Sequence, residues 1–348
     1  MKAYIQGAGC ISPQETAAGG PFLESVKSYE GNRLAVADPD YKQWIDIKMI
    51  RRMSRVIKMG VGASQLSLQD AGITMPDAII TGTAYGCLAD TSVFLNKMVT
   101  QQEEMLTPTA FIQSTHNTVA GQIALMLGCH AYNNTFVHRA FSFENALLDS
   151  MMILQEGNAK HILTGGLDEI TDHSHTILSR FGLFRNSISN SADLLQTPGE
   201  GTINGEGSAF FVLSSEKGNA VTEMQTPATL YKPSGAVETA VFIKEYLGDV
   251  MPDVVISGRS GNADEDMVMG ALERKLFPGK AIAGFKHLSG EYPTASAFAT
   301  WLGHNIIRTQ QVPEAVLLSG TAPSAIKNVL IINQYQGTHY SLLLLKAC

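Results

Sequence analysis

The alternation of hydrophobic and polar residues predicts a strand that ends in a sharp corner and leads directly into a helix. Apolar residues recur at helical spacing over residues 117–127, which is typical of an amphipathic helix. After a short turn comes a β-branched and aromatic run at 134–137, then a corner at 138–142 and a second helix. This order of elements presents one side chain from the end of a strand to a site.

Short apolar runs that suit strands occur twice along the chain, in the same order. PDAIITGT at residues 76–83 matches PDVVISGR at 252–259, and each follows a helical stretch, at 56–71 and 239–248. Apolar runs rich in β-branched residues are typical of strands buried on both faces between layers of helices. The repetition predicts a duplicated α/β unit.

Two further matches extend this repeat. AKHILTGG at residues 159–166 is matched by EAVLLSGT at 314–321, and a strand at 208–213 is matched by the final strands at 329–333 and 340–346. Chance pairing of short apolar strands is the alternative, because each match covers only a few residues.

The length of 348 residues, 45% of them hydrophobic, permits a large core and two or three domains. A polar segment at residues 216–230 separates the two repeats. We therefore expect an N-terminal half at residues 1–217 and a C-terminal half at 218–348.

The charge and the cysteines narrow the class of protein. A net charge of −7 argues against nucleic acid or an anionic membrane surface as the main partner. No run approaches the length of apolar sequence that spans a bilayer. The four cysteines (Cys10, Cys87, Cys129 and Cys348) lack the spacing of a metal site. We expect a soluble cytoplasmic protein with reduced thiols, no cofactor and no metal.

The segment around the corner resembles the centre of the β-ketoacyl synthase family, which has the thiolase fold. In that family a helix with the pattern Asn-x-x-Ala-Gly-x-Ile-Ala leads through a glycine turn to a strand that ends in Thr-Ala-Cys-x-Ser-Gly. The matching residues here are Asn117, Ala120, Gly121, Ile123, Ala124 and Gly128, followed without a gap by Ser142 and Ala146. The position of the nucleophilic cysteine then falls on Ala140, and a methyl group cannot attack a thioester.

Other family motifs follow in the expected order. Residues 51–70 resemble the family's Arg-Met-Ser helix, and 82–86 resemble its Gly-Thr-x-x-Gly turn. Residues 165–167 resemble its Gly-Gly segment, and 205–208 resemble its Gly-Glu-Gly-Ala corner. The resemblance implies an α/β, thiolase-like five-layered αβαβα fold made of two duplicated halves.

The two histidines that assist the cysteine in active members are also replaced. Ser257 stands where the His-Gly-Thr-x-Thr corner has its histidine. The Lys-x-x-x-Gly-His motif keeps its lysine as Lys286 but has Glu291 in place of histidine. The C-terminal glycine-rich loop is also degenerate, because NQYQGTHYS at residues 333–341 is shorter and bulkier.

These replacements limit the chemistry that the chain can perform. In active members the imidazoles donate hydrogen bonds to the thioester oxygen and to the enolate, a contribution of about 3 kcal/mol per donor. The hydroxyl of Ser257 is a weaker substitute, and a carboxylate at Glu291 repels the enolate unless it is protonated or paired. We expect no catalytic residue in the usual positions.

The resemblance implies a chain-length factor, a catalytically inactive subunit that forms a heterodimer with an active ketosynthase. It would act in fatty acid, polyketide or aryl-polyene-type elongation and meet an acyl carrier protein through the complex. An alternative is a homodimeric acyltransferase or decarboxylase that uses non-standard groups such as Ser142 or Glu291. A third is a stand-alone acyl-binding or scaffold protein.

Five residues are expected at the tunnel or the dimer interface by the same resemblance. The strand that carries Thr135 and Val137 pairs across a two-fold axis in the family, and Arg139 follows it. The segment with Phe111 and Ile112 reaches the partner's acyl tunnel, where bulky side chains cap the growing chain. Simple packing at the interface is the alternative for both.

Four further hypotheses concern polar residues. We predict that Arg139 or Lys286 pairs with Glu291, since a buried unpaired carboxylate is costly. Ser142 and His138 would make a nucleophile and base only within hydrogen-bond distance, and the alternative is that Ser142 caps the second helix by accepting from backbone N–H groups. The loop with Asp168, Glu169, Asp172, His173 and His175 is dense enough for a divalent ion, against a polar covering loop. Basic residues at 42–55 are candidates for receiving the carrier protein, or form a solvated surface.

Overall fold

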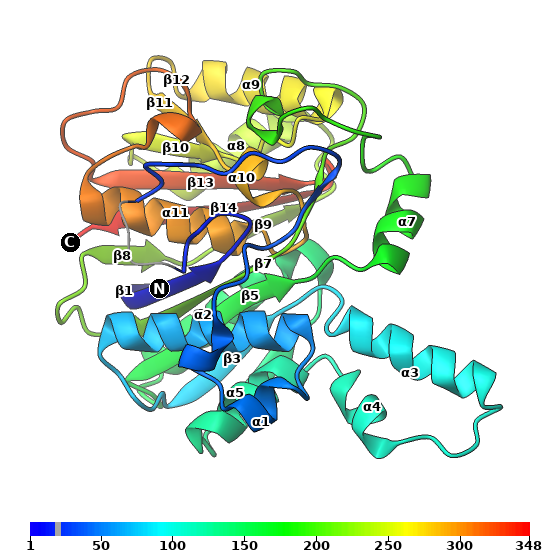
Figure 1. Cartoon of the computed structure of the whole chain (residues 1–348). Helices are drawn as coiled ribbons and strands as arrows, with labels where there is room; N and C mark the ends of the chain where they lie inside the picture. Colours follow the sequence, from blue (N-terminus) through cyan, green and yellow to red (C-terminus); the bar gives the residue numbers. More distant parts are fainter. Residues whose placement is uncertain (18–21) are drawn as a thin grey trace.

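The computed structural model describes residues 1–17 and 22–348, and helices alternate with strands in layers (Figure 1). The N-terminal half has five principal strands: β1 (Lys2–Ile11), β3 (Ala78–Gly82), β4 (Tyr132–Phe136), β5 (His161–Asp168) and β7 (Gly207–Ser214). They lie side by side in the order β1-β7-β5-β3-β4. β5, β3 and β4 are parallel, whereas β7 is antiparallel to β1 and β5.

The C-terminal half repeats this arrangement strand by strand. Its strands are β9 (Ala228–Tyr231), β10 (Val254–Ser257), β11 (Ala281–Gly284), β13 (Asn328–Tyr335) and β14 (His339–Ala347). The order β9-β14-β13-β10-β11, with antiparallel and parallel pairs in the same places, equals that of the first half. The predicted duplication of an α/β unit is confirmed.

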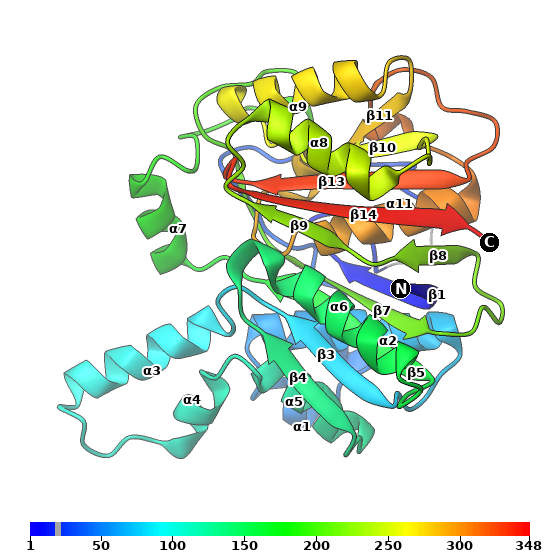
Figure 2. The same ribbon diagram turned by 180° about the vertical axis from the view of Figure 1, so that it is seen from behind.

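The helices also correspond between the halves. α2 (Arg55–Ala71), α5 (Thr118–Leu127) and α6 (Ser142–Gln155) occupy the places in the strand sequence that α8 (Ala236–Leu247), α9 (Ala263–Leu276) and α11 (Ser296–Thr309) occupy in the second half. One apolar cluster contains residues of α2 and α5, a second those of α6 and α11, and a third those of α8 and α9. These clusters fill the spaces between helices and strands, which gives the five layers visible in Figures 1 and 2.

One predicted match in the repeat is wrong. EAVLLSGT does not form the counterpart of β5, because its strand β12 (Leu317–Ser319) is short and lies antiparallel beside β11 at the end of the strand series. The true counterpart is β13, which follows β12 and lies between β10 and β14. Of the two final strands matched to residues 208–213, therefore, only the one at 340–346, in β14, corresponds to β7. A short apolar run does not show which neighbour a strand pairs with, and this caused the error.

Strand β8 (Thr222–Gln225) links the two halves, because it pairs with β1 on one side and with β14 on the other. We propose the boundary between the halves at residues 217 and 218, in the turn between β7 and β8.

The two glycines of β1, Gly7 and Gly9, allow α2 to pack close to this strand. A Cβ at Gly7 would lie 2.4 Å from the nitrogen of Ala71, and one at Gly9 would lie 2.3 Å from the oxygen of Ala63.

The smaller elements lie outside this repeat. They are β2 (Arg33–Leu34), β6 (Asn204–Gly205), α1 (Ile47–Ile50), α3 (Leu88–Thr100), α4 (Pro108–Gln113), α7 (Asp172–Arg180), α10 (Lys286–Ser289), and the 3-10 turns η1 (Tyr41–Gln43), η2 (Arg139–Phe141), η3 (Ser191–Asp193) and η4 (Glu314–Val316). Within the described part of the chain, none of the helices combines the length and the apolar character needed to cross a bilayer.

Candidate functional site

The chain turns sharply between β4 and α6, as the sequence pattern predicts. Arg139 has a φ of 47°, an unusual backbone conformation for a side-chain-bearing residue. The hydroxyl of Ser142 accepts from the backbone N–H of His138 at 2.8 Å and donates to the carbonyl of Arg139 at 2.8 Å. Ala140 is buried at the centre of this turn. Its methyl group therefore lies at the corner where the sequence resemblance predicts the position of the nucleophile.

Ser142 and His138 do not form a nucleophile and base. Both hydrogen bonds of the serine hydroxyl go to backbone atoms of the corner. The imidazole of His138 instead stacks on the ring of Phe141, with 5.7 Å between ring centroids. The hydroxyl closes the turn before α6, but the predicted helix cap is wrong, because Ser142 is the first residue of α6 and bonds only to residues that precede the helix.

The hydroxyl of Ser257, at the end of β10, forms a hydrogen bond with another side chain. Its hydroxyl donates to Oε1 of Glu273 on α9 at 2.6 Å. The same carboxylate accepts from Nε of Arg259 at 3.0 Å and forms an ion pair with its Nη2. Because the proton of this hydroxyl is already donated to Glu273, the hydroxyl of Ser257 is not available to a thioester oxygen.

The predicted ion pair with Glu291 is confirmed for Lys286. The ammonium Nζ lies 2.6 Å from Oε2 of Glu291 and donates to the carbonyl of Gln334 at 2.5 Å. Both side chains are almost completely buried. Burial raises the pKa of Glu291 to about 7, although the nearby charge of Lys286 lowers it. No ion pair of Arg139 is found among residues 1–17 and 22–348.

The space beside Glu291 is nearly filled. The cavity that remains has a volume of about 20 Å³, which is enough for about one water molecule. Its walls include Tyr85, Asp168, Glu291, Tyr292 and Tyr335. Tyr335 belongs to the segment predicted to replace the family's glycine-rich loop, and it lines this cavity. An acyl chain does not fit unless these side chains move.

The acidic and histidine-rich loop does not converge on a metal site. Asp168 accepts hydrogen bonds from Thr83, Ala84 and Thr294 at 2.8–3.1 Å, and its burial raises its pKa to about 6. In the described part of the chain, no three His, Cys, Asp or Glu side chains are grouped so that they could hold a metal ion. The bonds of Asp168 join the ends of β3 and β5 to the turn before α11.

Three further side chains of this loop have separate partners, whereas His173 is exposed. Asp172 pairs with Arg33, and Nδ1 of His175 lies 3.0 Å from the amide of Asn204. Glu169 accepts from the backbone N–H of Ala89 at 3.0 Å, and burial raises its pKa to about 7.

The comparison with known proteins identifies the family. Residues 27–218 match the family model described as "Beta-ketoacyl synthase, N-terminal domain", which is more than half of the chain. The chain belongs to the β-ketoacyl synthase family. Its fold is the thiolase-like fold of this family.

Curated β-ketoacyl synthases are similar over part of their length. A 3-oxoacyl-(acyl-carrier-protein) synthase 2 of Synechocystis sp. is 28% identical over 194 residues, which is 51% of this chain and 45% of that protein. A protein of the same name from Staphylococcus aureus is 22% identical over 183 residues, or 49% and 44% of the two chains. The chain thus spans less than half the length of these relatives.

Solved β-ketoacyl synthase structures match the whole fold. "The ishigamide ketosynthase/chain length factor" has a TM-score of 0.83 at 18% identity and covers 100% of this chain and 99% of that chain. A ketosynthase in complex with its chain length factor from Xenorhabdus doucetiae has a TM-score of 0.71 at 12% identity and covers 99% and 98%. At these identities the similarity concerns the fold.

Three of the five interface candidates in this β-ketoacyl synthase homologue, Thr135, Val137 and Arg139, lie on the edge strand β4 or directly after it. β4 is the last strand of its series, so its outer edge has no partner strand among the described residues. The hydroxyl of Thr135 binds inward, to Thr81 at 2.8 Å and to Asn117 at 3.1 Å. Val137 and Arg139 follow on the exposed side of the corner.

α3 and α4 extend from the body near this edge (Figures 1 and 2). Phe111 and Ile112 on α4 are 57% and 63% exposed. The ring of Phe111 packs on Phe94 of α3 with 5.5 Å between centroids. The structure thus leaves both predicted tunnel residues open to a partner.

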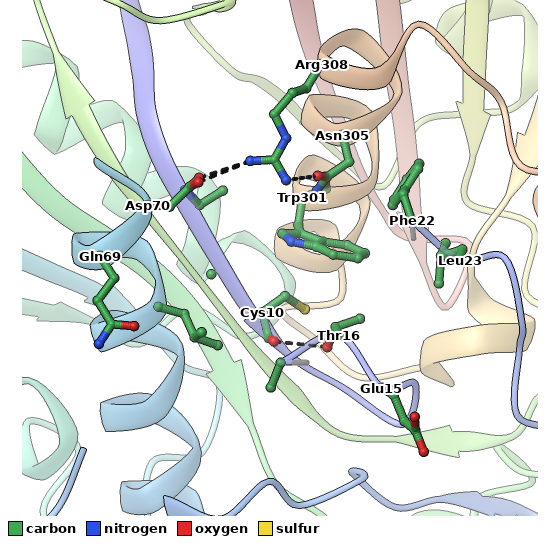
Figure 3. Close-up of a pocket in the computed structure, with 14 residues that line it drawn as sticks. Cys10, Glu15, Thr16, Phe22, Leu23, Gln69, Asp70, Trp301, Asn305 and Arg308 are labelled. Atoms are coloured by element: carbon green, nitrogen blue, oxygen red, sulfur yellow. Dashed lines mark hydrogen bonds and ion pairs between the residues drawn. The ribbon is translucent and has the colours of Figure 1, made fainter. Parts of the chain in front are cut away.

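A second cavity lies away from the corner, between α2 and α11 (Figure 3). Its volume is about 340 Å³. At its rim Arg308 binds Asp70 at 3.2 Å and Asn305 at 2.6 Å. Trp301 and Phe22 pack edge to face beside it, with 5.7 Å between centroids. The ion pair Asp70–Arg308 therefore connects the two halves, and its charges neutralise each other.

Proposed function

We propose that this chain is a catalytically inactive β-ketoacyl synthase-like subunit, a chain-length factor that pairs with an active ketosynthase. The pair would elongate chains of the fatty acid, polyketide or aryl-polyene type. The buried Lys286–Glu291 ion pair carries this proposal, because it occupies the place where the family resemblance puts a histidine that assists condensation.

The chemistry of the three positions supports inactivity. Ala140 offers no nucleophile. Ser257 is held by Glu273 and is not free to donate to an oxyanion. A carboxylate at Glu291 lies where a donor is needed, and the loss of each donor costs about 3 kcal/mol of transition-state stabilisation. Decarboxylation and condensation are both disfavoured.

The exposed edge of the N-terminal half supports pairing with another subunit. An unpaired edge strand is open to association with another chain, and large exposed apolar patches are typical of protein interfaces. Exposed apolar side chains near this edge are Val93, Leu95, Val99, Phe111, Ile112, Tyr132 and Val137. Their burial in a heterodimer would explain why the chain keeps them.

A carrier protein would meet the chain through this complex. One structure of similar fold is a type II polyketide synthase acyl carrier protein in complex with its ketosynthase bound to the hexaketide; its TM-score is 0.74 at 14% identity. Arg51 and Arg52 are exposed beside α4, whose Gln113 donates to the carbonyl of Arg52 at 2.5 Å. We propose that this basic segment assists the acidic carrier protein.

Phe111 is proposed to limit chain length by steric contact. In a reconstituted pair we expect Phe111→Ala to shift the products toward longer chains, because the smaller side chain leaves space at the tunnel floor. Mass spectrometry of the extracted products measures this shift. Val93→Ala on α3 is the control, since it truncates another exposed apolar side chain. A product distribution unchanged by Phe111→Ala contradicts the steric role.

Co-expression with an active ketosynthase tests the proposed pairing. We expect a one-to-one complex in native mass spectrometry, with condensation that depends on both subunits. A stable homodimer that ignores the active ketosynthase would favour the alternative of a homodimeric acyltransferase or decarboxylase.

A further inference from the structure

Two arginines lie close together on the outer face of the C-terminal half. A Cβ built at Gly270 on α9 would lie 3.1 Å from Nη2 of Arg259 and 3.2 Å from Nη1 of Arg274. The missing side chain at Gly270 thus leaves room for both guanidinium groups. Two like charges at such short range repel each other unless anions compensate them.

An acidic residue of the chain neutralises one of these two arginines, Arg259. Glu273, which is buried, binds Arg259 through Nε at 3.0 Å and through Nη2. It also accepts from Ser257, so its oxygens are already used. Arg274 has no ion-pair or hydrogen-bond partner among the residues that the structure describes, and neither has Nη1 of Arg259. The N–H groups of Arg274 and of Nη1 of Arg259 are therefore free to bind an anion from solution.

These groups face a groove of about 470 Å³ between the end of α9 and the edge strand β12. Lys280 lines the same groove, and Glu273 is the acidic residue in its wall. With Arg259 balanced by Glu273, the charges of Arg274 and Lys280 remain. Phe277 and Pro278 add an apolar side to the groove.

We propose that this groove binds a phosphate ester. A guanidinium offers two parallel N–H donors that match two phosphate oxygens, and such charge-assisted bonds are among the strong ones. A phosphate monoester carries close to two negative charges at neutral pH, which matches the two uncompensated cations. Its organic part would lie on Phe277 and Pro278. β12 and β4 are at opposite ends of the strand series, so this site is separate from the proposed partner surface.

Calorimetric titration of the full-length chain with phenyl phosphate, inorganic phosphate and benzoate tests the proposal. We expect saturable binding at one site, with phenyl phosphate the tightest, because it combines the dianion with an apolar body. Arg274→Gln should weaken its binding by about tenfold or more, since it removes a charge-assisted pair of hydrogen bonds. Arg274 is exposed, so we expect unchanged thermal unfolding of this variant.

Lys275→Gln is the matched control. Lys275 is the next residue on α9, is exposed and does not line the groove, so its removal changes the net charge equally and should leave the affinity nearly unchanged. An equal loss with Lys275→Gln would show general electrostatic attraction and overturn the proposal. So would the absence of saturable binding, or benzoate binding as tightly as phenyl phosphate.

Discussion

Replacing Lys286 by methionine is expected to destabilise the chain by about 3–5 kcal/mol, because it leaves the carboxylate of Glu291 buried without its counter-charge. Nζ of Lys286 is the partner of Oε2 at 2.6 Å, and Oε1 has no hydrogen-bond partner among the described residues. Methionine keeps a similar volume, so the change removes mainly the charge. The free energy of unfolding from denaturant titration measures the effect.

The destabilisation should depend on pH. Burial raises the pKa of Glu291 from its ordinary 4.5 to about 7. The folded chain therefore binds this proton more tightly than the unfolded chain, and the resulting stability is fully present below pH 4.5 and is lost as pH rises through 7. Without the ammonium group the pKa rises further. We expect Lys286→Met to cost less at pH 5 than at pH 8.

A double variant separates the charge from the packing. Lys286→Met combined with Glu291→Gln removes both charges and should recover much of the lost stability at pH 8. A cost below 1 kcal/mol for Lys286→Met alone, or the same cost at both pH values, would contradict the role given to this ion pair.

Val137→Glu is expected to weaken association with an active ketosynthase by about 100-fold or more, because an unpaired carboxylate would be buried at the proposed interface. Val137 follows β4 and is 45% exposed in the isolated chain. Because Val137 is exposed in the isolated chain, the substitution should change the stability of the subunit itself only slightly. Surface plasmon resonance or native mass spectrometry with the co-expressed partner measures the affinity.

The same substitution on another face provides the control. Val237 on α8 is 72% exposed and lies on the outer layer of the C-terminal half. Val237→Glu introduces an equal charge away from β4 and should leave the association unchanged. If both variants weaken the pair equally, β4 is not the contact surface.

The order of elements around Ala140 could be predicted because the hydrophobic pattern and the family resemblance give the same result there. Helical spacing, the glycine at residue 128 and a β-branched run give the order of elements, and the structure differs only in detail. β4 starts at Tyr132, two residues before the predicted strand. A partner for Glu291 could also be predicted, because the family resemblance puts Lys286 and Glu291 in one motif and a buried carboxylate needs a counter-charge; the choice of Lys286 over Arg139 came from the structure.

Pairing between distant elements could not be predicted in the same way. Glu273 is sixteen positions from Ser257 and on another element, and the sequence does not show which acidic residue of α9 faces β10. The bonds between Asp168 and Thr294 span both halves, and nothing local marks them. The repeat was misassigned at β12 for a related reason, since the apolar pattern of a strand says nothing of its neighbours.

Intact-protein mass spectrometry after exposure to an acyl thioester tests the central claim most directly. Cys10, Cys87 and Cys129 are buried and Cys348 is exposed, so the Cys348→Ser form of the chain removes the one thiol expected to react nonspecifically. Incubated with an acyl carrier protein thioester, this form should keep its mass, while an active ketosynthase paired with it gains the acyl group. An acyl group found on the isolated chain and mapped to the corner that contains Ala140 and Ser142 would contradict the account.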